Sequence, residues 1–154
     1  MINYKDLMIG NWVYESERSK FPMRVVNIGE DYCYLDFPEN EGDVFEVKDN
    51  DMMPIEVTEE LLLKNGFVKS DLAGCKDSYF IKLKNGFTEI DKNSNSIDRI
   101  WNCQIDNDRR ESIGGFDFQY LHELQNGIRL ITKSDLELKS YEQRKTKSSK
   151  RSCI

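Results

Sequence analysis

The sequence contains a single histidine, His122, among its 154 residues. It has four cysteines, but they are widely spaced and form no C-x-x-C pair. A zinc site requires three or four converging nitrogen or sulfur ligands, so the sequence predicts no metal site. Without a secretory signal, disulfides are not expected either, and we predict reduced thiols. The cysteines concerned are Cys33, Cys75, Cys103 and Cys153.

Long apolar runs are also absent. No stretch approaches the roughly 20 apolar residues that a membrane span needs. The N-terminus has no basic region followed by an apolar run and a cleavage site. The sequence therefore predicts a cytoplasmic protein with no membrane partner.

The familiar catalytic motifs are missing too. No serine lies in a G-x-S-x-G turn, and Gly114-Gly115 lacks the spacing and the following Lys and Ser/Thr of a phosphate-binding loop. We therefore predict no cofactor and assign no catalytic residue, which makes an enzyme the least favoured function. That function stays open, because an active site assembled from residues distant in sequence leaves no local motif.

Charge is distributed very unevenly along the chain. The net charge is −6, but residues 139–154 carry six cations against one carboxylate, which leaves residues 1–138 at −11. Residues 30–60 alone hold twelve carboxylates and one cation, Lys48. Such density is typical of a solvated face, and the alternative is an anionic surface that attracts a basic host protein. The candidate residues of this surface are Glu39, Glu41, Asp43, Asp49 and Asp51.

The basic C-terminal segment suggests the opposite kind of partner. Residues 140–154 are rich in Lys, Arg, Ser, Thr and Gln and nearly free of apolar side chains, which predicts a disordered tail. Such a tail could touch nucleic acid, fold back on the acidic body, or simply aid solubility. The acidic body, residues 1–138, would repel nucleic acid, which is therefore an unfavourable partner there.

The first third of the chain reads as a small β unit. Apolar runs broken by Gly, Asn, Asp and Pro predict strands at residues 9–14, 23–28, 33–37, 44–47 and 52–57. Five short strands with Gly10 near the start of the first predict an SH3-like β barrel over residues 1–57. Trp12 is expected in its core, with a ligand-stacking surface as the alternative.

The remainder reads as a mixed segment, residues 58–139, packed on the barrel as one compact unit. Thr58 predicts the start of a short helix that ends at Asn65-Gly66. Asn85-Gly86 predicts a β hairpin, because both residues tolerate positive φ, and a third strand is expected within residues 97–105. Residues 107–115 read as an exposed loop. The sequence therefore predicts an α+β fold.

An amphipathic helix is expected after residue 119, because apolar residues recur at spacings of three and four between Tyr120 and Ile131. Residues 136–138 are expected to close the fold as an edge strand. The helix also carries polar residues on one face, which indicates either a solvated face or a ligand site. In the second case the ligand would be a small, nucleotide-like anion in a cleft between barrel and helix. The candidate contacts are Trp12, His122, Gln125, Asn126 and Arg129.

Three segments resemble a family of small uncharacterised proteins of phages and mobile elements in Bacteroides-type bacteria. They are residues 7–14 (LMIGNWVY), residues 54–67 (PIEVTEELLLKNGF), and residues 120–126 (YLHELQN) with 136–138 (LEL). The resemblance implies an accessory protein but no chemistry, and fold alone does not supply function. Combined with the acidic body, it favours a non-enzymatic binding protein that acts on a host macromolecule.

Overall fold

The computed structural model describes residues 2–38, 40, 44–71, 77–92 and 100–142. The chain forms two compact units: unit 1 comprises Met1–Ile55 with Leu138–Ile154, and unit 2 comprises Glu56–Glu137. Each unit contains its own antiparallel sheet, and helices accompany them. The α+β class predicted from the sequence is therefore confirmed, whereas the packing of residues 58–139 on a barrel stays a prediction.

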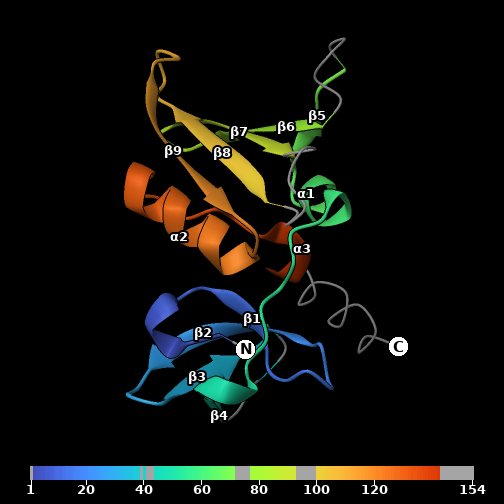
Figure 1. Cartoon of the computed structure of the whole chain (residues 1–154), viewed down its shortest axis with the longest axis vertical. Helices are drawn as coiled ribbons and strands as arrows, with labels where there is room; N and C mark the ends of the chain where they lie inside the picture. The colour runs from blue at the N-terminus through green and yellow to red at the C-terminus, as the bar shows by residue number, and fades with distance from the viewer. Residues whose placement is uncertain (1, 39, 41–43, 72–76, 93–99, 143–154) are drawn as a thin grey trace, which may run out of the picture. The chain divides into compact units, whose positions relative to one another are not determined.

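Unit 1 is built on a sheet whose strands are hydrogen-bonded in chain order (Figure 1). Side chains along the second and third strands alternate, so every second residue enters the core. The elements are η1 (Tyr4–Asp6), β1 (Trp12–Tyr14), β2 (Pro22–Ile28), β3 (Tyr32–Asp36), β4 (Phe45–Lys48) and η2 (Asp49–Asp51). The core residues are Ile2, Leu7, Val13, Met23, Val25, Cys33, Leu35 and Met52.

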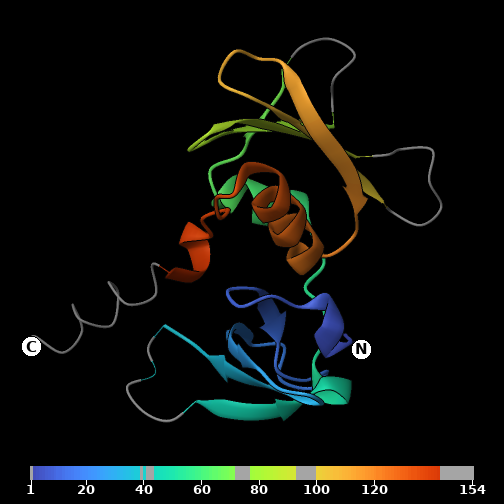
Figure 2. The same cartoon turned by 90° about the vertical axis from the view of Figure 1, so that its left-hand side faces the viewer.

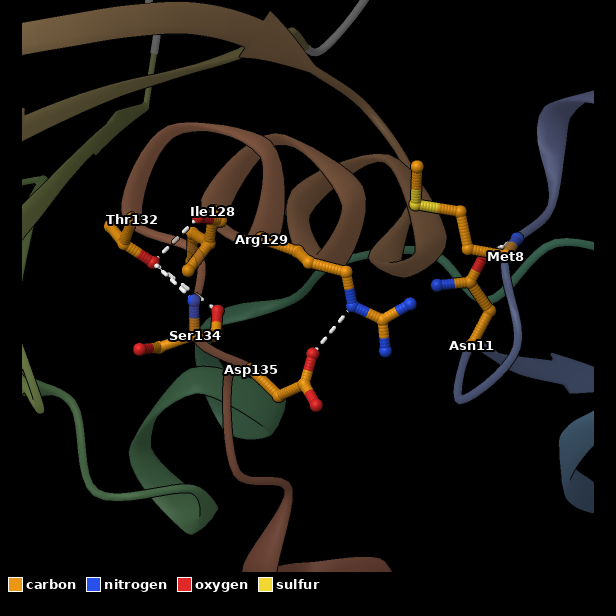
Figure 3. Close-up of polar contacts among 7 residues, drawn as sticks. All are labelled: Met8, Asn11, Ile128, Arg129, Thr132, Ser134 and Asp135. Atoms are coloured by element: carbon orange, nitrogen blue, oxygen red, sulfur yellow. Dashed lines mark hydrogen bonds and ion pairs between the residues drawn. The ribbon is translucent and has the colours of Figure 1, made fainter.

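The turn before β1 depends on Gly10, as the sequence suggested. Gly10 has a φ of +98°, and its N–H donates to the Val25 carbonyl at 2.8 Å. The buried Asn11 side chain accepts the Met8 N–H at 2.7 Å (Figure 3). The turn is therefore held by hydrogen bonds that the strand ladder does not supply.

The predicted fifth strand of unit 1 is not formed. Residues 52–57 contain two isolated bridges and no strand, and Met53 exchanges backbone hydrogen bonds with Tyr14 at 2.9 and 3.0 Å. Pro54 follows Met53 and has no N–H to extend the ladder. Within the described residues the sheet does not close, so the SH3-like barrel is not confirmed.

Unit 2 has a five-stranded sheet, also hydrogen-bonded in chain order. Its two helices lie on the same side of that sheet (Figures 1 and 2). The elements are α1 (Glu59–Lys64), β5 (Val68–Lys69), β6 (Ser78–Leu83), β7 (Gly86–Lys92), β8 (Trp101–Asp106), β9 (Ser112–Phe118) and α2 (Leu121–Thr132).

Both helices begin and end largely as predicted. The Thr58 hydroxyl accepts the Leu61 N–H at 3.2 Å, and Gly66 follows α1 with a φ of +90°. At α2 the Glu123 carboxylate accepts the Gln119 N–H at 2.8 Å. The buried stripe of α2, predicted by spacing, consists of Leu121, Leu124 and Ile128.

The predicted β6–β7 hairpin is present, but its turn differs by one residue. Leu83 pairs with Gly86, so Lys84 and Asn85 are the central residues. Of these residues only Gly86 has a positive φ, +150°. The Asn85 amide instead donates to the Ser134 hydroxyl at 2.9 Å, which ties this turn to the end of α2.

The prediction of an exposed loop over residues 107–115 is wrong, because β9 begins at Ser112 and pairs with β8. The two glycines that suggested a loop are needed for close packing. A Cβ on Gly114 would lie 3.0 Å from Ile131 Cδ1 of α2, and one on Gly115 would lie 3.0 Å from the Cys103 carbonyl oxygen. The true turn is shorter and centres on Asn107 and Arg110.

The C-terminal prediction also differs from the structure. Residues 136–138 form no strand, and α3 (Lys139–Glu142) follows where the disordered tail was expected to begin. Tyr141 of α3 packs its ring 4.8 Å from the ring of Trp12 in unit 1. That aromatic contact packs α3 against β1 within unit 1. The rest of the predicted tail, residues 143–154, lies outside the described residues.

Candidate functional site

The outer face of the unit 2 sheet, meaning the face opposite α2, carries a candidate site. Gly127 of α2 lies against Phe116 and Ile131 against Gly114, which fixes the face on which α2 packs. Among the described residues no helix covers the other face (Figures 1 and 2). By strand register, its side chains are those of Val68, Ser78, Phe80, Lys82, Phe87, Glu89, Asp91, Asn102, Gln104, Asp106 and Asp117.

A groove of about 550 Å³ crosses this face. We call it the outer groove. Its apolar part includes Val68 and Phe80, which are 67% and 39% exposed. Exposed apolar side chains gathered in a groove, unlike scattered ones, mark an interaction site. The outer groove is lined by Gly66, Val68, Phe80, Ile81, Lys82, Phe87, Thr88, Glu89, Asp106 and Arg110.

Two cations in the outer groove lie over one aromatic ring. Lys82 Nζ is 5.5 Å and Arg110 Cζ is 4.9 Å from the centre of the Phe87 ring. Arg110 has a φ of +62° in the β8–β9 turn. Asn107 Oδ1 organises that turn by accepting two backbone N–H groups, each at 2.9 Å. The turn positions the Arg110 guanidinium.

The carboxylates of the outer face are crowded together. The pKa of Glu89 is raised, first by burial and then by the negative charges of Asp91 and Asp106. Asp91 accepts a hydrogen bond from the Ser78 hydroxyl, and Asp117 accepts one from the Asn102 amide at 2.9 Å.

The raised pKa of Glu89 predicts a pH dependence of stability. The folded state binds this proton more tightly than the unfolded state, so stability is full below the unfolded-state pKa and falls as the pH rises through the raised value. We expect Glu89→Gln to raise the free energy of unfolding at pH 7 by about 0.5 kcal/mol, a figure reduced for solvent screening. The gain should vanish below pH of about 4.

Urea denaturation at the two pH values measures this difference. Glu137→Gln is the matched control, because Glu137 is exposed and lies outside the outer groove. A loss of stability at pH 7 in Glu89→Gln would show that the Glu89 charge is favourable in the folded protein, contrary to the prediction.

The polar residues predicted on α2 do lie together on that helix. His122 is only 4% exposed, and its ring stacks on that of Tyr120 at 6.0 Å between centroids. Arg129 Nε forms an ion pair with Asp135 at 2.5 Å (Figure 3), and Gln125 and Asn126 are half-buried. Arg129 is therefore already bound by a carboxylate within its own unit.

The C-terminal end of α2 is fixed by the hydroxyl group of Thr132. Thr132 Oγ1 donates to the Ile128 carbonyl at 2.7 Å and accepts the Ser134 N–H at 3.2 Å (Figure 3). Since Asn85 also reaches Ser134, the same contact region joins α2 to the β6–β7 turn. These contacts satisfy polar groups at the end of the helix, so their role is structural.

Trp12, the remaining predicted ligand contact, belongs to unit 1 and is 3% exposed. Its ring is packed in the interior beside Tyr141, in keeping with the core position expected for it. Its alternative role in ligand stacking stays a prediction.

The predicted acidic surface lies mostly outside the described residues. Glu39, Glu41 and Asp43 lie outside the described residues. The backbone of Asp49 belongs to η2, and Asp51 is exposed there. The clustered carboxylates that the structure does place are those of the outer face, on β7 to β9.

The described residues offer little support for metal or thiol chemistry. No group of three or more His, Cys, Asp or Glu side chains among them could hold a metal ion. Burial raises the pKa of Cys103 to about 11, so its thiol is protonated at neutral pH and is a poor nucleophile. Cys33 is also buried, while Cys75 and Cys153 lie outside the described residues.

No helix in the described part of the chain is long and apolar enough to cross a membrane. Comparison of the chain with protein-family models, curated proteins and solved structures gave no significant match.

Proposed function

We propose that this chain is a non-enzymatic binding protein that binds a basic protein partner through the outer face of unit 2. The observation that carries the proposal is the outer groove itself, where Glu89 and Asp106 lie beside the exposed Phe80. An uncovered sheet face with carboxylates and aromatic rings offers both charge and apolar area to a partner.

Charge complementarity selects a cationic partner. The outer face carries four carboxylates against Lys82 and the neighbouring Arg110, and both of these cations already lie over Phe87. Burial is the first cause of the raised pKa of Glu89, and the negative charges of Asp91 and Asp106 add to it. A Lys or Arg side chain entering beside Glu89 would offset those charges. The carboxylates concerned are Glu89, Asp91, Asp106 and Asp117.

The wider setting of the proposal rests on the sequence. The resemblance to phage and mobile-element proteins supports a host macromolecule as the partner, in the bacterial cytoplasm. We also infer that unit 1 is an SH3-like module. The bridge between Tyr14 and Met53, which follows η2 and returns the chain beside β1, supports that assignment.

A fluorescein-labelled lysine octapeptide tests the proposal by anisotropy. We expect binding that weakens as salt is added, because the contacts are between exposed charges. The double variant Glu89→Gln/Asp106→Asn should lower the affinity by about tenfold, or about 1.4 kcal/mol. The control Asp71→Asn/Glu137→Gln removes the same charges from exposed positions away from the outer groove and should leave affinity nearly unchanged.

A second candidate, a small anionic ligand, is supported by the two cations over Phe87. A glutamate octapeptide distinguishes the two functions. Tighter binding of the glutamate peptide, lost in Lys82→Gln/Arg110→Gln, would contradict the basic partner and favour the anion. Equal losses in both carboxylate double variants would show that net charge alone, rather than the outer groove, attracts the lysine peptide.

A further inference from the structure

Strand β9 forms one edge of the unit 2 sheet, and its outer side has no backbone partner among the described residues. Seven residues, Ser112–Phe118, form this edge. The opposite edge, β5, has only two residues, one of which is Lys69. An edge strand with unsatisfied N–H and C=O groups is a template for another strand.

The sequence of β9 contains none of the residues that usually block such pairing. It has no Lys, Arg or Pro, and Asp117 is its single charged residue. The one irregularity is a bulge near Ile113, at the start of the strand. Residues 114–118 pair regularly with β8, so most of the edge is straight enough to accept a partner.

Exposed apolar side chains accompany this edge. Ile113 of β9 is 45% exposed, and Leu130 of α2 is 57% exposed. Gly127 of α2 lies against β9. At about 100° per residue, Leu130 lies about 60° beyond Gly127, on the side away from the buried Leu124. A strand added to β9 would therefore have apolar surface close by.

We propose that two copies of this chain pair through β9, antiparallel, about a two-fold axis at Gly115. Gly115 is the midpoint of Ser112–Phe118, so this register pairs all seven residues. The five-stranded sheets of the two copies join into one continuous sheet, with α2 of each copy on the same face. Two-fold pairing of this kind closes on itself and does not propagate.

The strand is complementary to itself in this register. Phe116 of one copy lies opposite Gly114 of the other, on the face that α2 covers, and an aromatic ring can cover a glycine across a strand pair. Asp117 lies opposite Ile113, so the two Asp117 carboxylates do not face each other. These features favour a second copy over an unrelated peptide as the occupant of the edge.

Analytical ultracentrifugation of the full chain over a wide concentration range tests the proposal. We expect a reversible monomer–dimer equilibrium that Ile113→Asp shifts to monomer, because the new carboxylate would lie directly opposite Asp117 of the other copy. Leu63→Asp is the matched control: Leu63 is also an exposed apolar residue of unit 2, 45% exposed, but lies on α1. It should dimerise like the unaltered chain.

Hydrogen exchange provides a readout that needs no variant. Amides of β9 should become more protected as the concentration rises, with no such change in β5. A monomer at every concentration would overturn the proposal. So would a dimer that persists in Ile113→Asp, or protection that rises elsewhere and not in β9, because the interface would then lie away from this edge.

Discussion

Replacing Gly86 by alanine is expected to lower the free energy of unfolding of unit 2 by about 3 kcal/mol or more. Gly86 has a φ of +150°, a region that L-residues avoid, and a Cβ there would overlap the Asp106 carbonyl oxygen. That oxygen belongs to the backbone of β8, so the sheet itself would have to move. Strain and overlap therefore act together at this position.

Trp101 fluorescence can measure the loss in unit 2. The chain has two tryptophans, one in each unit, so Trp12→Phe leaves Trp101 as the reporter. Lys84→Ala is the control, because Lys84 is exposed in the same turn and has no positive φ. If Gly86→Ala unfolds at the same urea concentration as the control, Gly86 does not lie as close to the Asp106 carbonyl oxygen as the structure indicates.

Replacing Gly127 by alanine should destabilise unit 2 by about 1–2 kcal/mol, although alanine is the better helix former by about 1 kcal/mol. A Cβ on Gly127 would overlap the Phe116 ring of β9. Displacing that ring costs more than the helix gains. The glycine therefore sets how closely α2 approaches the sheet.

The double variant Gly127→Ala/Phe116→Leu distinguishes packing from helix propensity. In the Phe116→Leu background the overlapping ring atoms are gone, so Gly127→Ala should become stabilising by about 1 kcal/mol. A destabilising effect of the same size in both backgrounds would show that the cost does not come from Phe116.

Much of the local structure could be predicted from residue chemistry. Thr58 at the start of α1 and the apolar spacing of Leu121, Leu124 and Ile128 correctly predicted both larger helices. Asn85-Gly86 correctly located the β6–β7 hairpin. These signals are local, because a cap, a helical stripe and a tight turn each depend on residues only a few positions apart.

The outer groove could not be predicted in the same way. Glu89 and Asp106 are brought together by the pairing of β7 with β8, and Arg110 reaches Phe87 through a turn that follows β8. The available signal was the alternation along β6 and β7, which leaves Phe80 on the face opposite Tyr79. Without the strand order, that alternation does not reveal which face α2 covers.

Two of the errors, the loop at residues 107–115 and the fifth strand of unit 1, have related causes. The polar composition around Gly114 and Gly115 is typical of a loop, yet these glycines are required where β9 packs under α2 and beside β8. Pro54 and its neighbours have strand-like composition, yet this segment forms two isolated bridges. In both cases a tertiary contact, or its absence, overrode the local preference.

By itself the sequence determined the α+β class, most strand and helix positions, and the uneven distribution of charge, because each follows from local periodicity or composition. The tertiary structure alone decided the division into two units, the pairing of β9, and the gathering of carboxylates beside Phe80 and Phe87. The reason is physical: strand pairing joins residues far apart in sequence, and its geometry depends on side chains packed from other elements.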